Sequence, residues 1–160
     1  MSLNETNGEI GNLLPHRRPF LFVDEIVEAD NEKIVARHVF TPDEFFFAGH
    51  FPQYPVVPGV ILVETMAQSG GAGLRKLGVL GSGADSGADS GAAGGALFFL
   101  ASVDKVKFRR QVRPGEEVRS EILNLRVSSR MIKQAGKAYV GDELAAEAEW
   151  LCLISNPPQA

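Results

Sequence analysis

The chain has 160 residues, of which 44% are hydrophobic and ten are phenylalanine, and this is enough to build the core of one domain. Its formal net charge of −4 argues against general nucleic-acid binding, and its single cysteine, Cys152, excludes an intrachain disulfide. The polar N-terminus lacks a signal-peptide pattern, and no apolar run reaches the roughly 18 residues that a membrane-spanning helix needs. We therefore expect one domain over residues 1–160, located in the cytoplasm and without membrane insertion.

Two strands and a long loop are expected in the first third of the chain. Residues 20–27, FLFVDEIV, predict the first strand, and residues 32–40, EKIVARHVF, predict the second. His38 in the second strand is expected to be packed or exposed, without a chemical role. Residues 41–59 contain four prolines and two glycines, which favour an ordered loop over a strand.

A buried central helix is predicted by residues 60–78, VILVETMAQSGGAGLRKLG. Its first eight residues are apolar except for Glu64 and Thr65, and Pro58 just before it suits a helix start. The glycine-rich run at residues 70–73 lowers helix propensity, but it would let another backbone approach closely.

The helix is followed by a low-complexity segment at about residues 81–95, GSGADSGADSGAAGG. A segment of small and polar residues cannot build a core, so it predicts a flexible insert. We expect a tolerated loop insertion here.

The last third of the chain predicts antiparallel strands at residues 97–103, 106–112 and 118–127, and a final hairpin around Gly141. Between residues 105 and 113, basic and polar side chains alternate with apolar ones, with Arg110 as the exception. One long helix and a run of antiparallel strands indicate an α+β fold in which the sheet wraps around the helix.

Glu64 is the first candidate for chemistry, because a carboxylate is costly to bury in an apolar helix. Burial favours the neutral form of a carboxyl group, which can donate a proton as a general acid. Gln68 lies one turn further along the same helix face and could hydrogen-bond to Glu64. The spacing leaves equally open that Glu64 faces solvent at a gap in the apolar pattern.

His50 is the second candidate, since it lies in a phenylalanine-rich loop that leads directly into the helix. Apolar neighbours would keep the imidazole neutral, as a general base must be, although many loop histidines have no function. The unpaired N–H groups of Gly59 and Val60 at the helix start could bind a carbonyl oxygen. A base, an acid and an oxyanion site together describe removal of a proton next to a carbonyl, with loss of a leaving group.

Three blocks of the sequence resemble the signature blocks of the (3R)-hydroxyacyl-acyl carrier protein dehydratases of type II fatty acid synthesis. These blocks are LLPHRRPFLFVDEI, GHFPQYPVVPGVILVETMAQ and VDKVKFRRQVRPGEEV, and they occur in the family's order. The similarity covers most of residues 13–150 apart from the insert. It implies a hot-dog fold, in which an antiparallel sheet wraps a long helix, and a homodimer or a trimer of such dimers.

The resemblance also implies roles for individual residues. His50 would remove the α-proton, Glu64 would assist loss of the hydroxyl, and the N–H of Gly59 would polarise the thioester carbonyl. The expected oxyanion and substrate-binding set is Gly59, Val60, Gln68 and Phe99. The resemblance implies that His50 and Glu64 of one site come from different chains, and that neither a metal nor an organic cofactor is used. The sister dehydratase/isomerase group has Asp in place of Glu64, so dehydration without isomerisation is expected.

Some features depart from the family pattern or leave alternatives open. Phe99 falls near the position where the family often has a tyrosine that gates the acyl tunnel, and Ser102 replaces a usual glycine. His16 is expected to be structural.

Two alternatives to a dehydratase stay open. One is a hot-dog thioesterase that uses Glu64 to activate water, and the other is a non-catalytic acyl-binding subunit.

The basic stretch at residues 104–113 predicts a docking surface for acyl carrier protein, an acidic partner that carries its substrate on a phosphopantetheine arm. The residues expected to form this surface are Lys105, Lys107, Arg109 and Arg113. The stretch is equally compatible with a solvated strand face.

Overall fold

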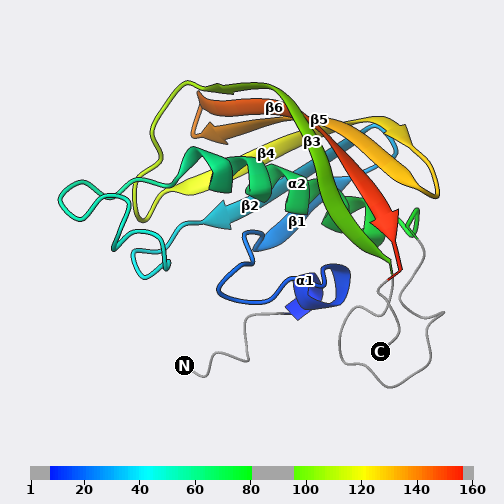
Figure 1. Cartoon of the computed structure of the whole chain (residues 1–160), viewed down its shortest axis with the longest axis horizontal. Helices are drawn as coiled ribbons and strands as arrows, with labels where there is room; N and C mark the ends of the chain where they lie inside the picture. The colour runs from blue at the N-terminus through cyan, green and yellow to red at the C-terminus, as the bar shows by residue number, and fades with distance from the viewer. Residues whose placement is uncertain (1–7, 81–95, 157–160) are drawn as a thin grey trace.

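The computed structural model describes residues 8–80 and 96–156, so the predicted insert at residues 81–95 lies outside the described residues (Figure 1). The helices are α1 (Gly8–Leu13) and α2 (Gly59–Lys76). The strands are β1 (Glu25–Ala29), β2 (Lys33–Val39), β3 (Leu97–Phe108), β4 (Glu117–Val127), β5 (Met131–Val140) and β6 (Glu143–Ser155).

The six strands form one sheet in the order β1-β2-β4-β5-β6-β3, and every neighbouring pair is antiparallel. Figure 1 shows this sheet curving around α2, with the loop that precedes α2 beyond the helix's first turn. The predicted α+β architecture is therefore confirmed, with a central helix held by an antiparallel sheet. β1 and β3 form the two edges, and β3 reaches its edge position by pairing with β6, the last strand in sequence.

The close approach of α2 to the sheet depends on the glycine-rich run in the helix. A Cβ atom built at Gly73 would lie only 2.5 Å from Cγ2 of Ile34 on β2, and one at Gly71 would lie 2.9 Å from the ring of Phe98 on β3. Side chains of the sheet, rather than a second backbone, therefore occupy the space beside these glycines. The helix still forms because its apolar residues pack into the core around Leu62, Met66 and Leu74.

Two strand predictions were wrong at their boundaries. The first strand begins at Glu25 rather than at residue 20, because the N–H of Phe22 donates to Oε1 of Gln68 at 2.8 Å instead of joining the sheet. β3 is one strand over residues 97–108, where two shorter strands were expected.

The strict alternation expected along residues 105–113 is also absent. The pairing of β3 with β6 shifts register between Asp104 and Lys107, and Lys105 has a φ of 52°. Beyond Phe108 the strand ends, although the N–H groups of Arg109 and Arg110 still donate to the carbonyl of Ala145 on β6. Further on, the carbonyl of Val112 accepts a hydrogen bond from the N–H of Val57 at 2.8 Å. The predicted hairpin at Gly141 is confirmed, since a turn there joins β5 to β6 and the glycine has a φ of 57°.

Candidate active site

Glu64 lies in the second turn of α2 and is held by a fixed amide. Nε2 of Gln68 donates to Oε1 of Glu64 at 2.9 Å and to the carbonyl of Phe20 at 3.2 Å. Oε1 of Gln68 accepts the N–H of Phe22 at 2.8 Å, and the Gln68 side chain is buried. The backbone of residues 20–22 therefore determines which way the Gln68 amide is oriented. In this orientation the amide presents an N–H to the Glu64 carboxylate.

The carboxylate of Glu64 borders a cavity of about 140 Å³ between α2 and the edge strand β3. Its side chain is only 20% exposed, so the alternative of a solvent-facing Glu64 is not what the structure shows. The other lining residues are mostly apolar or aromatic: His16, Ala67, Gln68, Phe98, Phe99, Leu100 and Cys152. Phe99, predicted to bind substrate, does line this cavity, and about half of its side chain is exposed.

His16 was expected to be structural, yet it faces Glu64 in the structure. Nε2 of His16 lies 3.6 Å from Oε1 of Glu64. Burial lowers the pKa of His16, and this effect outweighs the opposing effect of the Glu64 carboxylate, so the imidazole is neutral at pH 7. Its Nδ1 is buried without a hydrogen-bond partner among the described residues. Its place in the LLPHRRPF block was the only sequence signal for this position.

Cys152 on β6 is a second residue of this cavity that the sequence did not single out. Burial raises the pKa of the Cys152 thiol to about 11, and the nearby Glu64 carboxylate adds to this effect. The thiol therefore stays protonated at neutral pH, and it lines the cavity as a small, uncharged side chain.

His50 is fixed by three contacts in the loop before α2. Its N–H donates to the carbonyl of Phe46 at 2.9 Å, its ring stacks on Phe51 with centroids 4.4 Å apart, and its Nδ1 lies 3.1 Å from the carbonyl oxygen of Val56. Because a carbonyl oxygen only accepts, Nδ1 must carry the hydrogen of the neutral ring. Nε2 is then left with the lone pair that a general base needs.

The start of α2 shares a hollow of about 490 Å³ with His50. No described residue accepts a hydrogen bond from the N–H groups of Gly59 or Val60, and the N-cap residue Pro58 offers no side-chain cap. Free N–H groups at a helix start favour a developing negative charge. The structure therefore brings together the predicted base and the predicted oxyanion group. Phe108 on β3 covers this end of the hollow.

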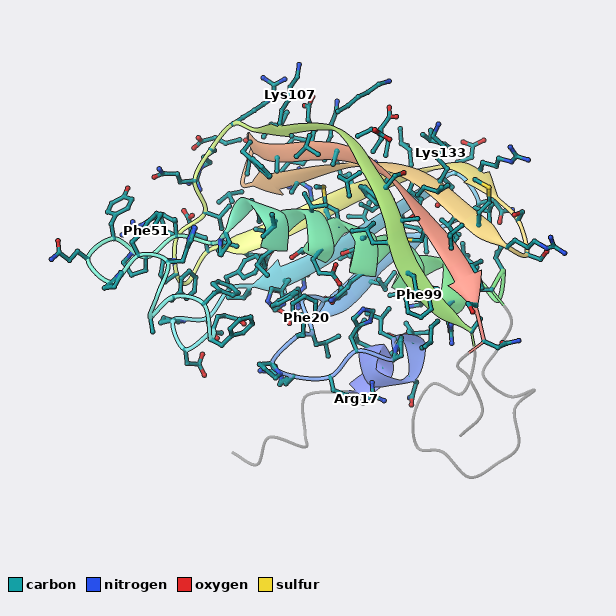
Figure 2. All side chains as sticks on the ribbon, in the orientation of Figure 1. Arg17, Phe20, Phe51, Phe99, Lys107 and Lys133 are labelled. Carbon is teal, nitrogen blue, oxygen red and sulfur yellow. The ribbon has the colours of Figure 1, made fainter. Side chains whose placement is uncertain are left out.

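His50 and Glu64 do not meet within the described chain. They line separate cavities, and no hydrogen bond or ion pair joins them in residues 8–80 and 96–156. Gly59 borders the His50 hollow, and Glu64 lies five residues further along α2. Five residues correspond to a rise of about 7.5 Å along a helix axis. Figure 2 shows Phe51, the neighbour of His50, and Phe99, which lines the Glu64 cavity, at opposite ends of α2.

The four predicted docking residues differ in the contacts that their side chains make with other described residues. Lys105 lies 3.4 Å from Glu149, Arg109 lies 3.3 Å from Glu147, and the guanidinium of Arg113 stacks 3.8 Å above the ring of Tyr54. Lys107 forms no ion pair with any described residue, and Figure 2 shows it pointing away from the sheet. The ion pairs are largely exposed, so they hold the basic side chains only weakly.

In the part of the chain that the structure describes, no group of three or more His, Cys, Asp or Glu side chains could hold a metal ion. Neither described helix has both the length and the apolar character needed to cross a membrane.

A family model and individual relatives of known function both match this chain, and they indicate the same family. A model of the FabA-like domain matches residues 14–149. The chain is 41% identical over 147 residues to the 3-hydroxyacyl-[acyl-carrier-protein] dehydratase FabZ of Rhizorhabdus wittichii, covering 91% of this chain and 86% of that protein. It is 42% identical over 148 residues to the FabZ dehydratase of Desulforamulus reducens, covering 92% and 95%.

Solved structures share the fold at low sequence identity. The dehydratase heterocomplex ApeI:P from Xenorhabdus doucetiae has a TM-score of 0.69 at 15% identity, covering 92% of this chain and 90% of that chain. The phenylacetic acid degradation protein PaaI from Thermus thermophilus, in a mutant form, has a TM-score of 0.53 at 11% identity, covering 81% and 90%. At these identities the likeness establishes the hot-dog fold alone.

Proposed function

Since this chain belongs to the FabA-like family and is a FabZ-type 3-hydroxyacyl-[acyl-carrier-protein] dehydratase of fatty acid biosynthesis, we propose that His50 and Glu64 perform the elimination. The proposed substrate is a (3R)-hydroxyacyl thioester on acyl carrier protein. The proposed products are the trans-2-enoyl thioester and water.

The elimination divides into three tasks. Nε2 of His50 takes the proton from C2, next to the thioester carbonyl. The N–H of Gly59 donates to the carbonyl oxygen, where negative charge develops as the proton leaves. Glu64 gives a proton to the hydroxyl on C3, directly or through water, so that the C3–O bond breaks and water departs. The electron pair of the broken C2–H bond becomes the new double bond.

The observation that carries this assignment is the shared hollow of His50 and the free helix N–H groups. A base beside a carbonyl-polarising N–H is the arrangement that α-proton removal requires. A thioesterase that used Glu64 to activate water would not need His50 as a base beside these N–H groups. A non-catalytic acyl-binding subunit would need neither residue.

The edge strand β3 supports a homodimer that unites the two cavities. Apolar side chains are exposed along almost its whole length: Phe99, Leu100, Val103, Val106 and Phe108. An exposed apolar edge strand is a template for pairing with another chain. We infer that the occupant is the β3 strand of a second copy.

Such pairing has a direct consequence for the site. Phe108 lies at the His50 hollow, while Phe98 to Leu100 lie at the Glu64 cavity, so the two ends of β3 mark the two half-sites. Antiparallel pairing about a two-fold axis puts the Phe108 end of one strand beside the Phe98 end of the other. His50 of one chain then faces Glu64 of its partner across the interface.

Product analysis tests the reaction. Incubating the protein with 3-hydroxyacyl thioester on acyl carrier protein should produce the absorbance of a conjugated enoyl thioester, without release of free thiol. Release of free thiol in step with substrate loss would instead assign a thioesterase. Absence of both signals with the folded protein would favour the non-catalytic acyl-binding subunit.

A further inference from the structure

A buried histidine joins the sheet to the loop that carries His50. His38 on β2 is only 4% exposed. Its Nδ1 lies 2.9 Å from Oδ1 of Asp24, just before β1, and its Nε2 lies 3.1 Å from Oε1 of Glu44 in the loop. The second oxygen of Asp24 accepts the N–H of Val39 at 2.7 Å, so this carboxylate is itself fixed to the sheet.

The geometry favours the doubly protonated ring. Both ring nitrogens of His38 face carboxylate oxygens, and an ionised carboxylate only accepts hydrogen bonds. A neutral imidazole has a single N–H, so its lone pair would point at either Asp24 or Glu44. An imidazolium donates to both at once, and such charge-assisted hydrogen bonds are stronger than neutral ones.

The loop between Glu44 and His50 is short and internally bonded. The carbonyl of Glu44 accepts the N–H of Phe47 at 3.2 Å, and the carbonyl of Phe46 accepts the N–H of His50 at 2.9 Å. The side chains of Phe46 and Phe47 are both buried. A change in the position of Glu44 would therefore reach the backbone of His50 through these two overlapping turns.

We propose that His38, as an imidazolium, is a positioning residue that fixes the loop of residues 44–50 and through it the general base. The proposal rests on the role of His50 proposed above. His38 lies outside the hollow that would hold the substrate, so its effect on the reaction is indirect.

The proposal predicts a dependence on pH. The groups that face the ring among the described residues are Asp24, Glu44 and the aromatic rings of Phe22 and Phe40, and the cation Arg37 lies near Asp24. Burial by itself lowers the pKa of His38, but the hydrogen bonds to the two carboxylates outweigh it and hold this pKa above 6.5. The clamp is therefore complete below pH 6.5 and is lost as pH rises through the raised pKa.

Two substitutions separate the charge of His38 from its volume. His38→Gln removes the charge, and we expect kcat to fall roughly tenfold to a hundredfold with little change in KM, since small misplacements of a catalytic group have effects of this size. His38→Lys keeps a permanent positive charge with several donors. It should restore the activity lost in His38→Gln and remove the fall in kcat/KM that we expect in the wild-type protein as pH rises through the raised pKa of His38. The matched control is Asp43→Asn, an exposed carboxylate next to Glu44, which should keep the wild-type pH profile.

Hydrogen exchange tests the same proposal without any variant or any turnover. After correction for intrinsic rates, protection of the Phe47 and His50 amides should fall as pH rises above 6.5, while that of a β5 amide such as Ile132 should not. Constant protection at Phe47 and His50 would overturn the proposal. So would a wild-type profile in His38→Gln, or an unchanged alkaline limb in a folded His38→Lys. Failure of His50 as the base would appear instead as full activity in His50→Ala, whatever the exchange shows.

Discussion

Backbone atoms orient His50 directly, and they orient Glu64 through the uncharged side-chain amide of Gln68. The carbonyl of Val56 selects the tautomer of His50, and the backbone of residues 20–22 orients the Gln68 amide that holds Glu64. Both side chains are therefore set in direction before substrate binds. Groups positioned in advance contribute most to proton transfer, because no reorganisation is needed in the transition state.

Removing either group should abolish most of the activity and leave the fold intact. His50→Ala deletes the proposed base, and Glu64→Gln keeps the side-chain volume while removing the ionisable proton. We expect each to lower kcat by ~10²–10⁴-fold, the usual effect of a lost acid or base. Steady-state kinetics measure the loss of kcat, and melting curves check that the fold is intact. The matched control is Glu28→Gln, at an exposed position of β1. Near-normal kcat in folded Glu64→Gln would remove Glu64 from the mechanism.

The cysteine beside Glu64 should resist alkylation. With the pKa of its thiol at about 11, roughly one Cys152 in ten thousand is a thiolate at pH 7, and the thiolate is the reactive form. Labelling by N-ethylmaleimide, followed by mass spectrometry, should therefore be very slow at pH 7 and faster as the pH rises toward 10. Rapid labelling at pH 7, at the rate of an unfolded control, would show that Cys152 is neither buried nor shifted.

At the scale of elements, the contact of α2 with β2 depends on a missing side chain. In an exposed helix, Gly→Ala stabilises by about 1 kcal/mol. At Gly73 the new Cβ would lie 2.5 Å from Ile34, so we expect Gly73→Ala to destabilise by about 1–3 kcal/mol instead. Denaturant unfolding measures the change in the free energy of unfolding.

A double-mutant cycle identifies the cause. Ile34→Ala removes the atoms that the new Cβ would meet, so in that background Gly73→Ala should have little effect or should stabilise. Gly49→Ala is the matched control, because a Cβ there meets nothing within 4 Å. Equal destabilisation by Gly73→Ala in both backgrounds would show that contact with Ile34 is not the reason.

The sequence predicts elements that depend on local pattern and misses those that depend on tertiary contacts. The apolar run at residues 60–78 sufficed to predict α2, and Gly141 sufficed for the last hairpin. The start of β1 was misplaced because the N–H of Phe22 bonds to a side chain 46 residues away. The contact of His16 with Glu64 was missed for the same reason, since it joins a turn to a helix far along the chain.

At the scale of the whole molecule, mixing two inactive variants tests whether the site is shared between chains. If each site takes His50 from one chain and Glu64 from the other, a heterodimer of His50→Ala and Glu64→Ala has one intact site. Refolding an equimolar mixture gives heterodimers in about half of the dimers, so activity should recover to roughly a quarter of wild type. No recovery, with subunit exchange confirmed by tagged chains, would place both residues of a site in one chain.

Docking of acyl carrier protein can be tested at Lys107, the predicted docking residue that has neither an ion pair nor a cation–π contact among the described residues. Lys107→Glu should raise KM for carrier-bound substrate but not for a small thioester surrogate, and added salt should reduce the difference. The control Lys133→Glu makes the same charge change at an exposed position of β5, at the other end of the face seen in Figure 2. It should leave both KM values unchanged. Equal effects of Lys107→Glu on both substrates would contradict docking at this surface.

The attachment of Gln68 to residues 20–22 has a consequence for how the protein tolerates genetic variation. The hydrogen bonds come from the N–H of Phe22 and the carbonyl of Phe20, which almost every amino acid supplies. The partly exposed side chain of Phe20 can therefore change without breaking the support of the acid, whereas the side chain of Phe22 is fully buried in the core. Only proline at position 22, which has no N–H, deletes the donor outright. A catalogue of tolerated substitutions would consequently understate how much catalysis depends on this segment.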